Sequence, residues 1–192
     1  MVKLYTKQGD KGKTTICGMK VEKNHPRLSV LGALDELNSS LGMVLALNEA
    51  EGLALSEVEG LALPPELKIL EDIQRDLMEI GASLGFTDKD ISPLLSNKTA
   101  VLEKEIDRMW ENLPLLQNFI LPGGGKTGSL LHFARAVCRR AERKMVFLAQ
   151  KEKVLPEVLV YLNRLSDFLF ALARWINQKK GHEEKIWPNQ RK

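Results

Sequence analysis

The sequence predicts an all-α protein, a bundle of five helices preceded by an ordered glycine-rich N-terminal loop. Apolar residues recur at helical spacing in five separate segments, and we find no convincing strand pattern. The chain has 192 residues, 44% of them hydrophobic, which is enough for one sizeable core. We therefore interpret residues 1–192 as a single domain, with a loop over 1–27, the bundle over 28–181 and a tail over 182–192.

The N-terminal segment lacks helical periodicity and carries the sequence TKQGDKGKTT over residues 6–15. Its glycines permit backbone geometries that aim N–H groups at an anion, and its lysines and threonines can bind phosphate oxygens. A mobile chain terminus often has the same composition, so this segment alone leaves both interpretations open.

The first two helices follow from apolar spacing and proline positions. Leucines and a valine form a helical seam over residues 28–48. Pro64 and Pro65 suit the first turn of a second helix that ends near Leu84. Between them the pentapeptide EGLAL occurs at 51–55 and again at 59–63, which we interpret as a duplication that lengthens the connecting loop.

The remaining helices are expected over 98–112, from about residue 127 to Gln150, and from Pro156 to a stop at Gly181. The connector over 113–127 contains PGGGKTG, which resembles the end of a Walker A loop. Ile120 stands where that motif needs a glycine, and no strand precedes it. We therefore interpret the segment as a flexible connector that shapes a pocket wall. The tail beyond Gly181 is polar apart from Ile186 and Trp187.

The fourth helix contains the most informative stretch, FARAVCRRAER over 133–143. Arg135, Arg139 and Glu142 are spaced by four and three residues and share one helical face beside an apolar stripe. The fifth helix places four residues at the same kind of spacing: Asn163, Asp167, Phe170 and Arg174. Polar groups near two core-facing seams predict a pocket for a charged ligand, and a solvated basic face is the alternative.

The first helix offers a possible partner for these arginines. Asp35, Asn38 and Gly42 of ALDELNSSLG share a face beside the leucine seam. A buried carboxylate there needs a cationic partner, and the arginines of the fourth helix are available. A structural ion pair explains Asp35 as well as a functional one does.

Composition excludes several function classes. The three histidines lack metal-ligand spacing, and no Ser/His/Asp or Cys/His set can be argued. Two cysteines, Cys17 and Cys138, make neither a disulfide framework nor a zinc site. A net charge of +3 is too mild to predict nucleic-acid binding. We see no apolar run of membrane-spanning length and no signal peptide, so we expect a cytoplasmic protein without membrane partners.

Four blocks, TKQGDKGKTT, DELNSSLG, FILPGGGKTGSLLHFARAVCRRAER and YLNRLSDFLFALAR, resemble the PduO-type ATP:cob(I)alamin adenosyltransferases in order and spacing. The resemblance covers nearly the whole chain. It implies a homotrimeric five-helix bundle with active sites between subunits. It also implies that cobalt(I) of a corrinoid attacks the 5′ carbon of ATP, which yields adenosylcobalamin and triphosphate.

The resemblance also implies residue roles. Asp35 is expected to pair across the subunit interface with Arg135, and Phe119 to lie against the corrin ring with Asp167 nearby. Such an aromatic residue displaces the lower axial ligand, which makes cobalt four-coordinate and easier to reduce. Catalysis is expected to depend on Phe119, Asp35, Arg135 and Arg139. The expected ATP ligands are Thr6, Gly9, Asp10, Lys11, Gly12, Thr14, Thr15, Lys23, Arg139, Arg140, Glu142, Asn163 and Arg164.

The implied cofactor and partners are Mg²⁺, held mainly by the ATP phosphates rather than by protein ligands, and an electron donor such as a reductase. Two positions depart from the family pattern: Lys20 replaces a frequent arginine, and Ala33 a frequent threonine. A non-catalytic nucleotide sensor on the same bundle would share the loop and the arginines but would not need Phe119. A purely structural bundle would leave the glycine loop and the matched blocks unexplained.

Overall fold

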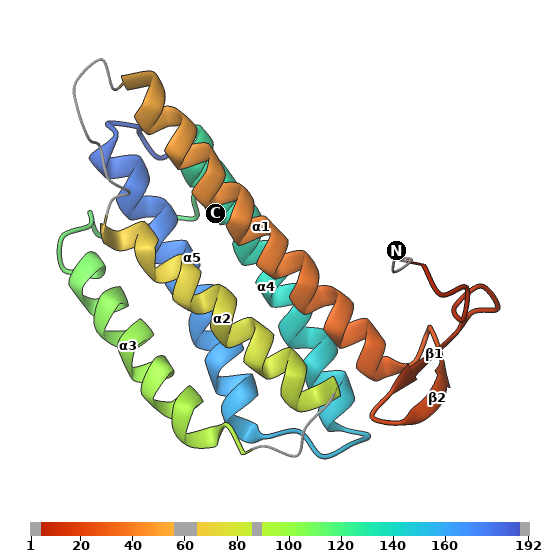
Figure 1. The fold of residues 1–192 in the computed structure, drawn as a ribbon. Helices are drawn as coiled ribbons and strands as arrows, with labels where there is room; N and C mark the ends of the chain where they lie inside the picture. The colour runs from red at the N-terminus through yellow and green to blue at the C-terminus, as the bar shows by residue number, and fades with distance from the viewer. Residues whose placement is uncertain (1–4, 56–64, 86–89, 189–192) are drawn as a thin grey trace.

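The computed structural model of the chain describes residues 5–55, 65–85 and 90–188. Within these ranges the chain forms two short strands and five helices: β1 Lys13–Ile16, β2 Met19–Glu22, α1 Pro26–Leu55, α2 Pro65–Gly85, α3 Ser92–Trp110, α4 Lys126–Ala149 and α5 Pro156–Lys179. The long helices lie side by side in an elongated bundle, with the two strands beside the start of α1 (Figure 1). The predicted five-helix fold is confirmed.

The core lies between helices that pack in pairs. α1 packs against α2 and α4, and α5 packs against α4 and α3. Leu37 and Leu41 of α1, Ala134 and Ala141 of α4, and Leu165 of α5 are all fully buried in one cluster. The alanines of α4 have small side chains, which suits close approach of the neighbouring helices.

The N-terminal segment contains a β-hairpin, so the expectation of a loop without strands was wrong. β1 pairs with β2 in antiparallel register, and the turn residues Cys17 and Gly18 both have positive φ, 50° and 72°. Two such residues match a two-residue primed turn. Each strand has four residues and Ile16 is buried, so the segment is too short to display an alternating pattern in the sequence.

The hairpin docks on the end of α2. The Cys17 backbone N–H donates to the Gly85 carbonyl at 3.1 Å, and its thiol donates to the same oxygen at 2.8 Å. Arg27 strengthens this junction: it donates to the Leu84 carbonyl at 2.9 Å and forms an ion pair with Glu152, in the α4–α5 connection. The glycine-rich segment is thus attached both to the end of α2 and, through Arg27, to the α4–α5 connection.

Two predicted boundaries need correction. α1 continues to Leu55, so the first EGLAL copy, at 51–55, is the end of a helix and not a loop; the second copy lies outside the described residues. α3 begins at Ser92 rather than at residue 98, because Pro93 occupies its first turn. Leu95, one turn further, is buried. α2, α4 and α5 agree with prediction to within one or two residues.

The expectation that the chain has no apolar run of membrane-spanning length was also wrong. The segment Pro26–Leu47 of α1 is long and apolar enough to meet the length and composition criterion for a membrane span, with a mean hydropathy of 1.3. Core helices of bundles meet the same criterion. Here Leu34, Leu37 and Leu41 are buried in the core, and α1 packs against α2 and α4, so the apolar character of α1 is explained by the bundle.

Candidate active site

Three of the predicted site residues are electrostatically coupled on α4 and α5. The Arg135 guanidinium lies 5.0 Å from the centroid of the Phe170 ring, a cation–π distance. Burial lowers the pKa of Arg135, repulsion from Arg139 lowers it further, and the Asp167 carboxylate opposes both. Arg139 and Asp167 therefore both lie close enough to Arg135 to interact with it electrostatically.

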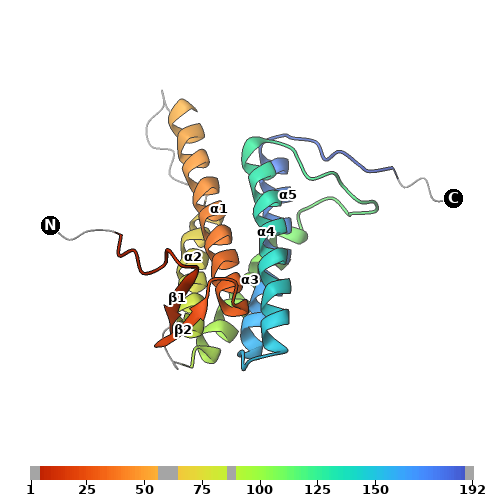
Figure 2. The same ribbon diagram turned by 90° about the vertical axis from the view of Figure 1, so that its right-hand side faces the viewer.

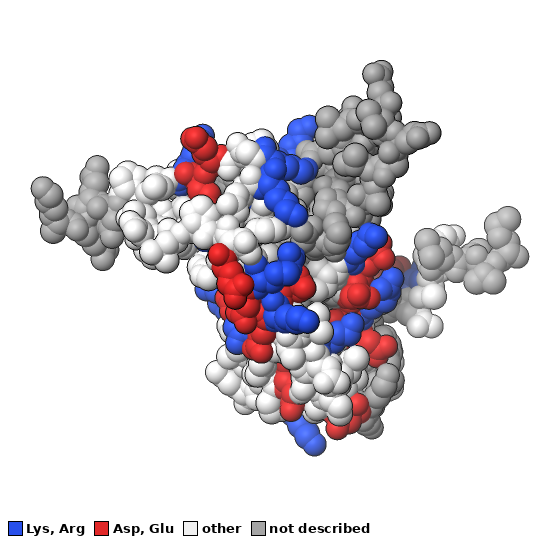
Figure 3. Space-filling view, turned by 90° about the vertical axis from the view of Figure 1, so that its left-hand side faces the viewer, with Lys and Arg blue, Asp and Glu red and all other residues white. Residues whose placement is uncertain are grey.

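Polar contacts continue along the same surface. Asn163 Nδ2 donates to Glu142 Oε1 at 3.0 Å, which joins α5 to α4. Arg164 donates to Asp167 Oδ2 and to Glu103 Oε1, both at 2.9 Å, which joins α5 to α3. Beside Asp167 a cavity of about 500 Å³ opens between α3 and α5. Seen from the α3 side, acidic and basic side chains are interleaved over the surface (Figure 3).

The two adjacent arginines of α4 have different environments. Arg140 forms an ion pair with Glu36 of α1 in the same protomer. Arg139 is exposed and has no ion-pair partner within the described residues. Of these two arginines, Arg139 is thus the one without an acidic contact among the described residues, whereas Arg140 contacts Glu36.

The predicted N-terminal ligands form a second group. The Lys23 N–H donates to the Gly12 carbonyl at 2.8 Å, and a Cβ added at Gly9 would lie 3.0 Å from Lys23 Nζ. Lys11 is exposed, and Gly12 has a φ of +74°. The segment from Thr6 to Lys23 therefore forms one compact turn and hairpin in which glycine gives the backbone its shape.

Asp35 is exposed and lines a largely apolar groove of about 560 Å³ between α1 and α2, next to Asn38 and Met78. Among the described residues Asp35 has no ion-pair partner, and the Arg135 guanidinium lies over the Phe170 ring. The Asp35–Arg135 pair is therefore not formed within one protomer. The predicted pairing across a subunit interface stays a prediction.

Phe119 lies on the connector between α3 and α4 and is 70% exposed. Its ring centroid lies 6.1 Å from that of Trp187 in the C-terminal tail. The connector and the tail project together from the bundle, on the side opposite the hairpin (Figure 2). Sequence reasoning did not place the tail; the two apolar residues Ile186 and Trp187 in a polar segment were the signal that it is anchored.

The glycines of PGGGKTG have a packing function. Asn177 Nδ2 donates to the Gly123 carbonyl at 2.8 Å, and the Gly125 N–H donates to Asn177 Oδ1 at 3.1 Å. A Cβ at Gly124 or Gly128 would lie only 2.3 or 2.0 Å from atoms of that side chain. The rejection of a phosphate-binding loop agrees with this arrangement, but close approach rather than flexibility explains the glycines.

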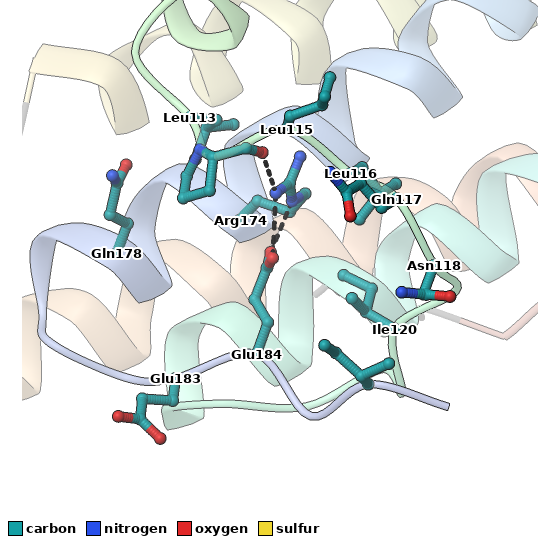
Figure 4. A pocket seen from close by; sticks show the side chains of 12 residues that line it. Leu113, Leu115, Leu116, Gln117, Asn118, Ile120, Arg174, Gln178, Glu183 and Glu184 are labelled. Carbon is teal, nitrogen blue, oxygen red and sulfur yellow. Dashed lines mark hydrogen bonds and ion pairs between the residues drawn. The ribbon is translucent and has the colours of Figure 1, made fainter. Parts of the chain in front are cut away.

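Sequence reasoning also missed Arg174, which it noted only for its helical spacing. The side chain is 1% exposed and lines a cavity of about 430 Å³ beneath the connector and the tail (Figure 4). An arginine inside the otherwise apolar run FLFALARWI, residues 168–176, was the available signal, because a buried arginine needs a partner that the local sequence does not supply.

Comparison with known proteins shows which family this sequence is similar to. The family model described as cobalamin adenosyltransferase matches residues 4–176. The corrinoid adenosyltransferase of Bacillus subtilis (strain 168) is 42% identical over 181 residues, 94% of this chain and 89% of that protein. Corrinoid adenosyltransferase MMAB of Homo sapiens is 39% identical over 198 residues, 96% and 73% of the two chains.

Solved structures include a variant of the PduO-type ATP:corrinoid adenosyltransferase from Lactobacillus reuteri, complexed with cobalamin and ATP. It aligns with a TM-score of 0.78 and 33% identity, over 97% of this chain and 100% of that chain. A second variant of the same protein, complexed with ATP, gives a TM-score of 0.79 and 37% identity, over 96% and 100%.

Proposed function

Because the chain belongs to the cobalamin adenosyltransferase family, we propose that it transfers the 5′-deoxyadenosyl group of ATP to the cobalt of cob(I)alamin. The products are adenosylcobalamin and triphosphate. The observation that carries this proposal is the family match over residues 4–176, which includes all the predicted site residues from Thr6 to Asp167. The nucleophile belongs to the corrinoid, so the reaction needs no catalytic serine, cysteine or histidine.

For ATP, we propose that the phosphates bind between the N-terminal hairpin segment and α4. Arg139, exposed and without an acidic partner among the described residues, is the group best suited to stabilise the negative charge that accumulates on departing triphosphate. Glu142 and Asn163 hold each other at 3.0 Å and are suited to orient the nucleoside. Lys11 and Lys23 of the hairpin segment supply further positive charge.

For the corrinoid, we propose that Phe119 lies against the face of the ring, where it displaces the lower axial ligand. Its exposure of 70% on a projecting connector leaves the ring free to meet a large planar ligand. Asp167 borders the neighbouring cavity of about 500 Å³ and would lie near the corrinoid. The electron that produces cobalt(I) would come from an external donor such as a reductase.

The active assembly is proposed to be a homotrimer with each site between two subunits. Three observations support this. Neither Asp35 nor Arg135 forms an ion pair within the described part of its own protomer. Asp35 also borders an apolar groove that a neighbouring chain can cover. Finally, the hairpin and the Phe119 connector lie on opposite sides of one protomer (Figure 2).

We propose that Mg²⁺ enters with ATP. Phosphate oxygens are ligands that Mg²⁺ prefers, so the ATP itself would supply most of its coordination. The cytoplasm remains the proposed location, where a reductant and ATP are both supplied.

The direct test is anaerobic incubation of the purified protein with chemically reduced cobalamin and MgATP. Adenosylcobalamin should form, as followed by absorbance, together with one equivalent of intact triphosphate. Phosphate and pyrophosphate as primary products would contradict the displacement mechanism. ATP binding without any adenosylcobalamin would instead favour the nucleotide sensor.

A further inference from the structure

An exposed aromatic side chain can act on a ring only if its backbone is held in place. At Phe119 the backbone is held by the C-terminal tail. The Trp187 N–H donates to the Phe119 carbonyl at 2.8 Å, and the Leu121 N–H donates to the Lys185 carbonyl at 2.7 Å. Residues 119–121 and 185–187 thus pair in antiparallel fashion around an Ile120–Ile186 bridge. We call this two-stranded unit the flap.

A buried guanidinium connects the flap to the bundle. Arg174 of α5 donates to both carboxylate oxygens of Glu184, from Nε at 2.5 Å and from Nη2 at 2.9 Å. Nη2 also donates to the Pro114 carbonyl at 2.9 Å. Figure 4 shows the Glu184 side chain pointing from the tail to Arg174.

The position of these contacts along the chain is important. Glu184 directly precedes the paired residues of the tail, and Pro114 lies near the start of the connector that carries Phe119. One side chain therefore contacts the bases of both strands of the flap. The guanidinium also lies 5.0 Å from the centroid of the Trp110 ring, at the end of α3, so packing fixes its position.

Removing either partner would leave an unpaired charge in an apolar setting. Arg174 is 1% exposed, and Glu184 is 23% exposed at its side chain. A buried arginine without its carboxylate is strongly disfavoured, and a lysine cannot reproduce the planar two-point contact. The tail would then shift from its place, together with the backbone of Phe119.

We propose that Arg174 is a positioning residue for the cobalt chemistry. Through Glu184 and Pro114 it fixes the flap, and the flap fixes the Phe119 ring that faces the corrinoid. This inference rests on the proposed role of Phe119. Arg174 itself touches neither substrate, so it should influence the reduction-dependent route without changing ATP affinity.

The test compares Glu184→Gln and Arg174→Lys with Glu183→Gln. Glu183 is the exposed neighbour of Glu184, so its variant carries the same charge change without loss of the Arg174 contact. Each protein is assayed with cob(II)alamin plus a reductant, and with cob(I)alamin prepared in advance. The fraction of four-coordinate cob(II)alamin is measured by electron paramagnetic resonance, and ATP affinity by titration.

We expect Glu184→Gln and Arg174→Lys to lower the cob(II)alamin rate by about ten- to hundredfold, since small displacements of a positioned group have effects of that size. The four-coordinate fraction should fall in parallel. Rates with cob(I)alamin and affinities for ATP should stay within about twofold, as should every property of Glu183→Gln. Thermal unfolding identifies any variant of Arg174 that fails to fold, and Glu184→Gln on the tail then carries the test.

Two results would overturn the proposal: a normal four-coordinate fraction in Glu184→Gln, or equal losses with cob(II)alamin and cob(I)alamin. Phe119→Ala separates this failure from failure of the proposed corrin contact. If Phe119→Ala loses only the cob(II)alamin route but Glu184→Gln does not, the positioning role of Arg174 is wrong. If Phe119→Ala shows no such selectivity, the assignment of Phe119 itself is wrong.

Discussion

At the scale of single residues, Asp76 shows how a buried carboxylate is accommodated away from the site. It accepts a hydrogen bond from the Tyr161 hydroxyl at 2.9 Å and lies 3.5 Å from Lys98 Nζ. Burial raises the pKa of Asp76 above its ordinary 3.8, although Tyr161 and Lys98 oppose the shift. The folded protein therefore binds this proton more tightly than the unfolded chain does.

This shift fixes the sign of a pH dependence. Below the pKa of Asp76 in the unfolded chain, the protonated side chain contributes fully to the free energy of unfolding. This contribution is lost as pH rises through the higher pKa of the folded protein, and it does not return up to neutral pH. Asp76→Asn keeps an oxygen for Tyr161 but does not titrate. Its free energy of unfolding in urea should therefore decline less than that of the wild type over this acidic window.

Two variants accompany that measurement. Glu71→Gln changes an exposed carboxylate on the same helix and should leave the wild-type profile nearly unchanged. Asp76→Leu removes the acceptor of the buried Tyr161 hydroxyl and should cost about 1–3 kcal/mol. A profile for Asp76→Asn that superimposes on the wild type would show that Asp76 does not titrate with a raised pKa.

Arg139 is the residue at which charge and function should be most closely linked. Replacing it with alanine removes a cation proposed to contact the phosphates, and a lost charge-assisted contact is worth about 1.5–3 kcal/mol. Adenosyl transfer from cob(I)alamin should slow by roughly ten- to hundredfold, measured by absorbance together with ATP titration. The control is Arg143→Ala, which changes another exposed arginine on α4. Similar losses in both variants would show that only the overall charge matters.

At the scale of elements, the glycine segment before α4 depends on space more than on mobility. Gly124 has a φ of +104°, and an added Cβ would lie 2.3 Å from Asn177. Gly124→Ala should destabilise the fold by about 1–3 kcal/mol in urea unfolding, because it combines backbone strain with a clash. Gly181→Ala, which has φ of +69° but open space, gives the backbone contribution alone. Equal costs would argue against the clash.

The helices were predictable because their evidence is local. A repeat near 3.6 residues and a proline in the first turn identify α2 and α5 without knowledge of the fold. The hairpin could not be predicted in this way, since its four-residue strands are docked on the bundle by Cys17 at the end of α2, a contact between positions 68 residues apart along the chain.

Predictability of the site follows the same rule. Arg135, Arg139 and Glu142 share a helical face that spacing alone reveals. The hydrogen bond between Asn163 and Glu142 was not predicted, although both residues were expected at the nucleotide. The partners of Arg140 and Arg174 were missed, because Glu36 and Glu184 meet them only after the bundle folds. Residue spacing predicts which side chains share a helical face, whereas tertiary packing decides which of them form ion pairs with residues far away in the sequence.

At the scale of the whole molecule, the proposed trimer makes Asp35 the most revealing position. In the protomer it is exposed, so Asp35→Asn should leave the folded monomer intact. If Asp35 pairs with the neighbouring subunit's Arg135 in a buried interface, losing one partner should weaken association by about 3–5 kcal/mol. Light scattering over a concentration series would show the trimer dissociating, with activity lost in parallel.

Charge reversal provides the matching control. Asp35→Arg with Arg135→Asp in the same chain restores opposite charges across the interface and should recover part of the association lost in either single variant. A wild-type monomer with full activity would contradict the proposed assembly outright.

The placement of the hairpin and the flap on opposite sides of one protomer (Figure 2) has a genetic consequence. If each site takes its hairpin from one chain and its α4 arginine from the next, two inactive alleles can complement each other. Lys11→Glu and Arg139→Ala, co-expressed in equal amounts, would assemble at random into closed rings. About a quarter of the sites would then combine two unaltered halves and regain activity. If each site were contained in one chain, no activity would return. Recessive mutations in the two regions would therefore complement each other only if the sites are shared between chains.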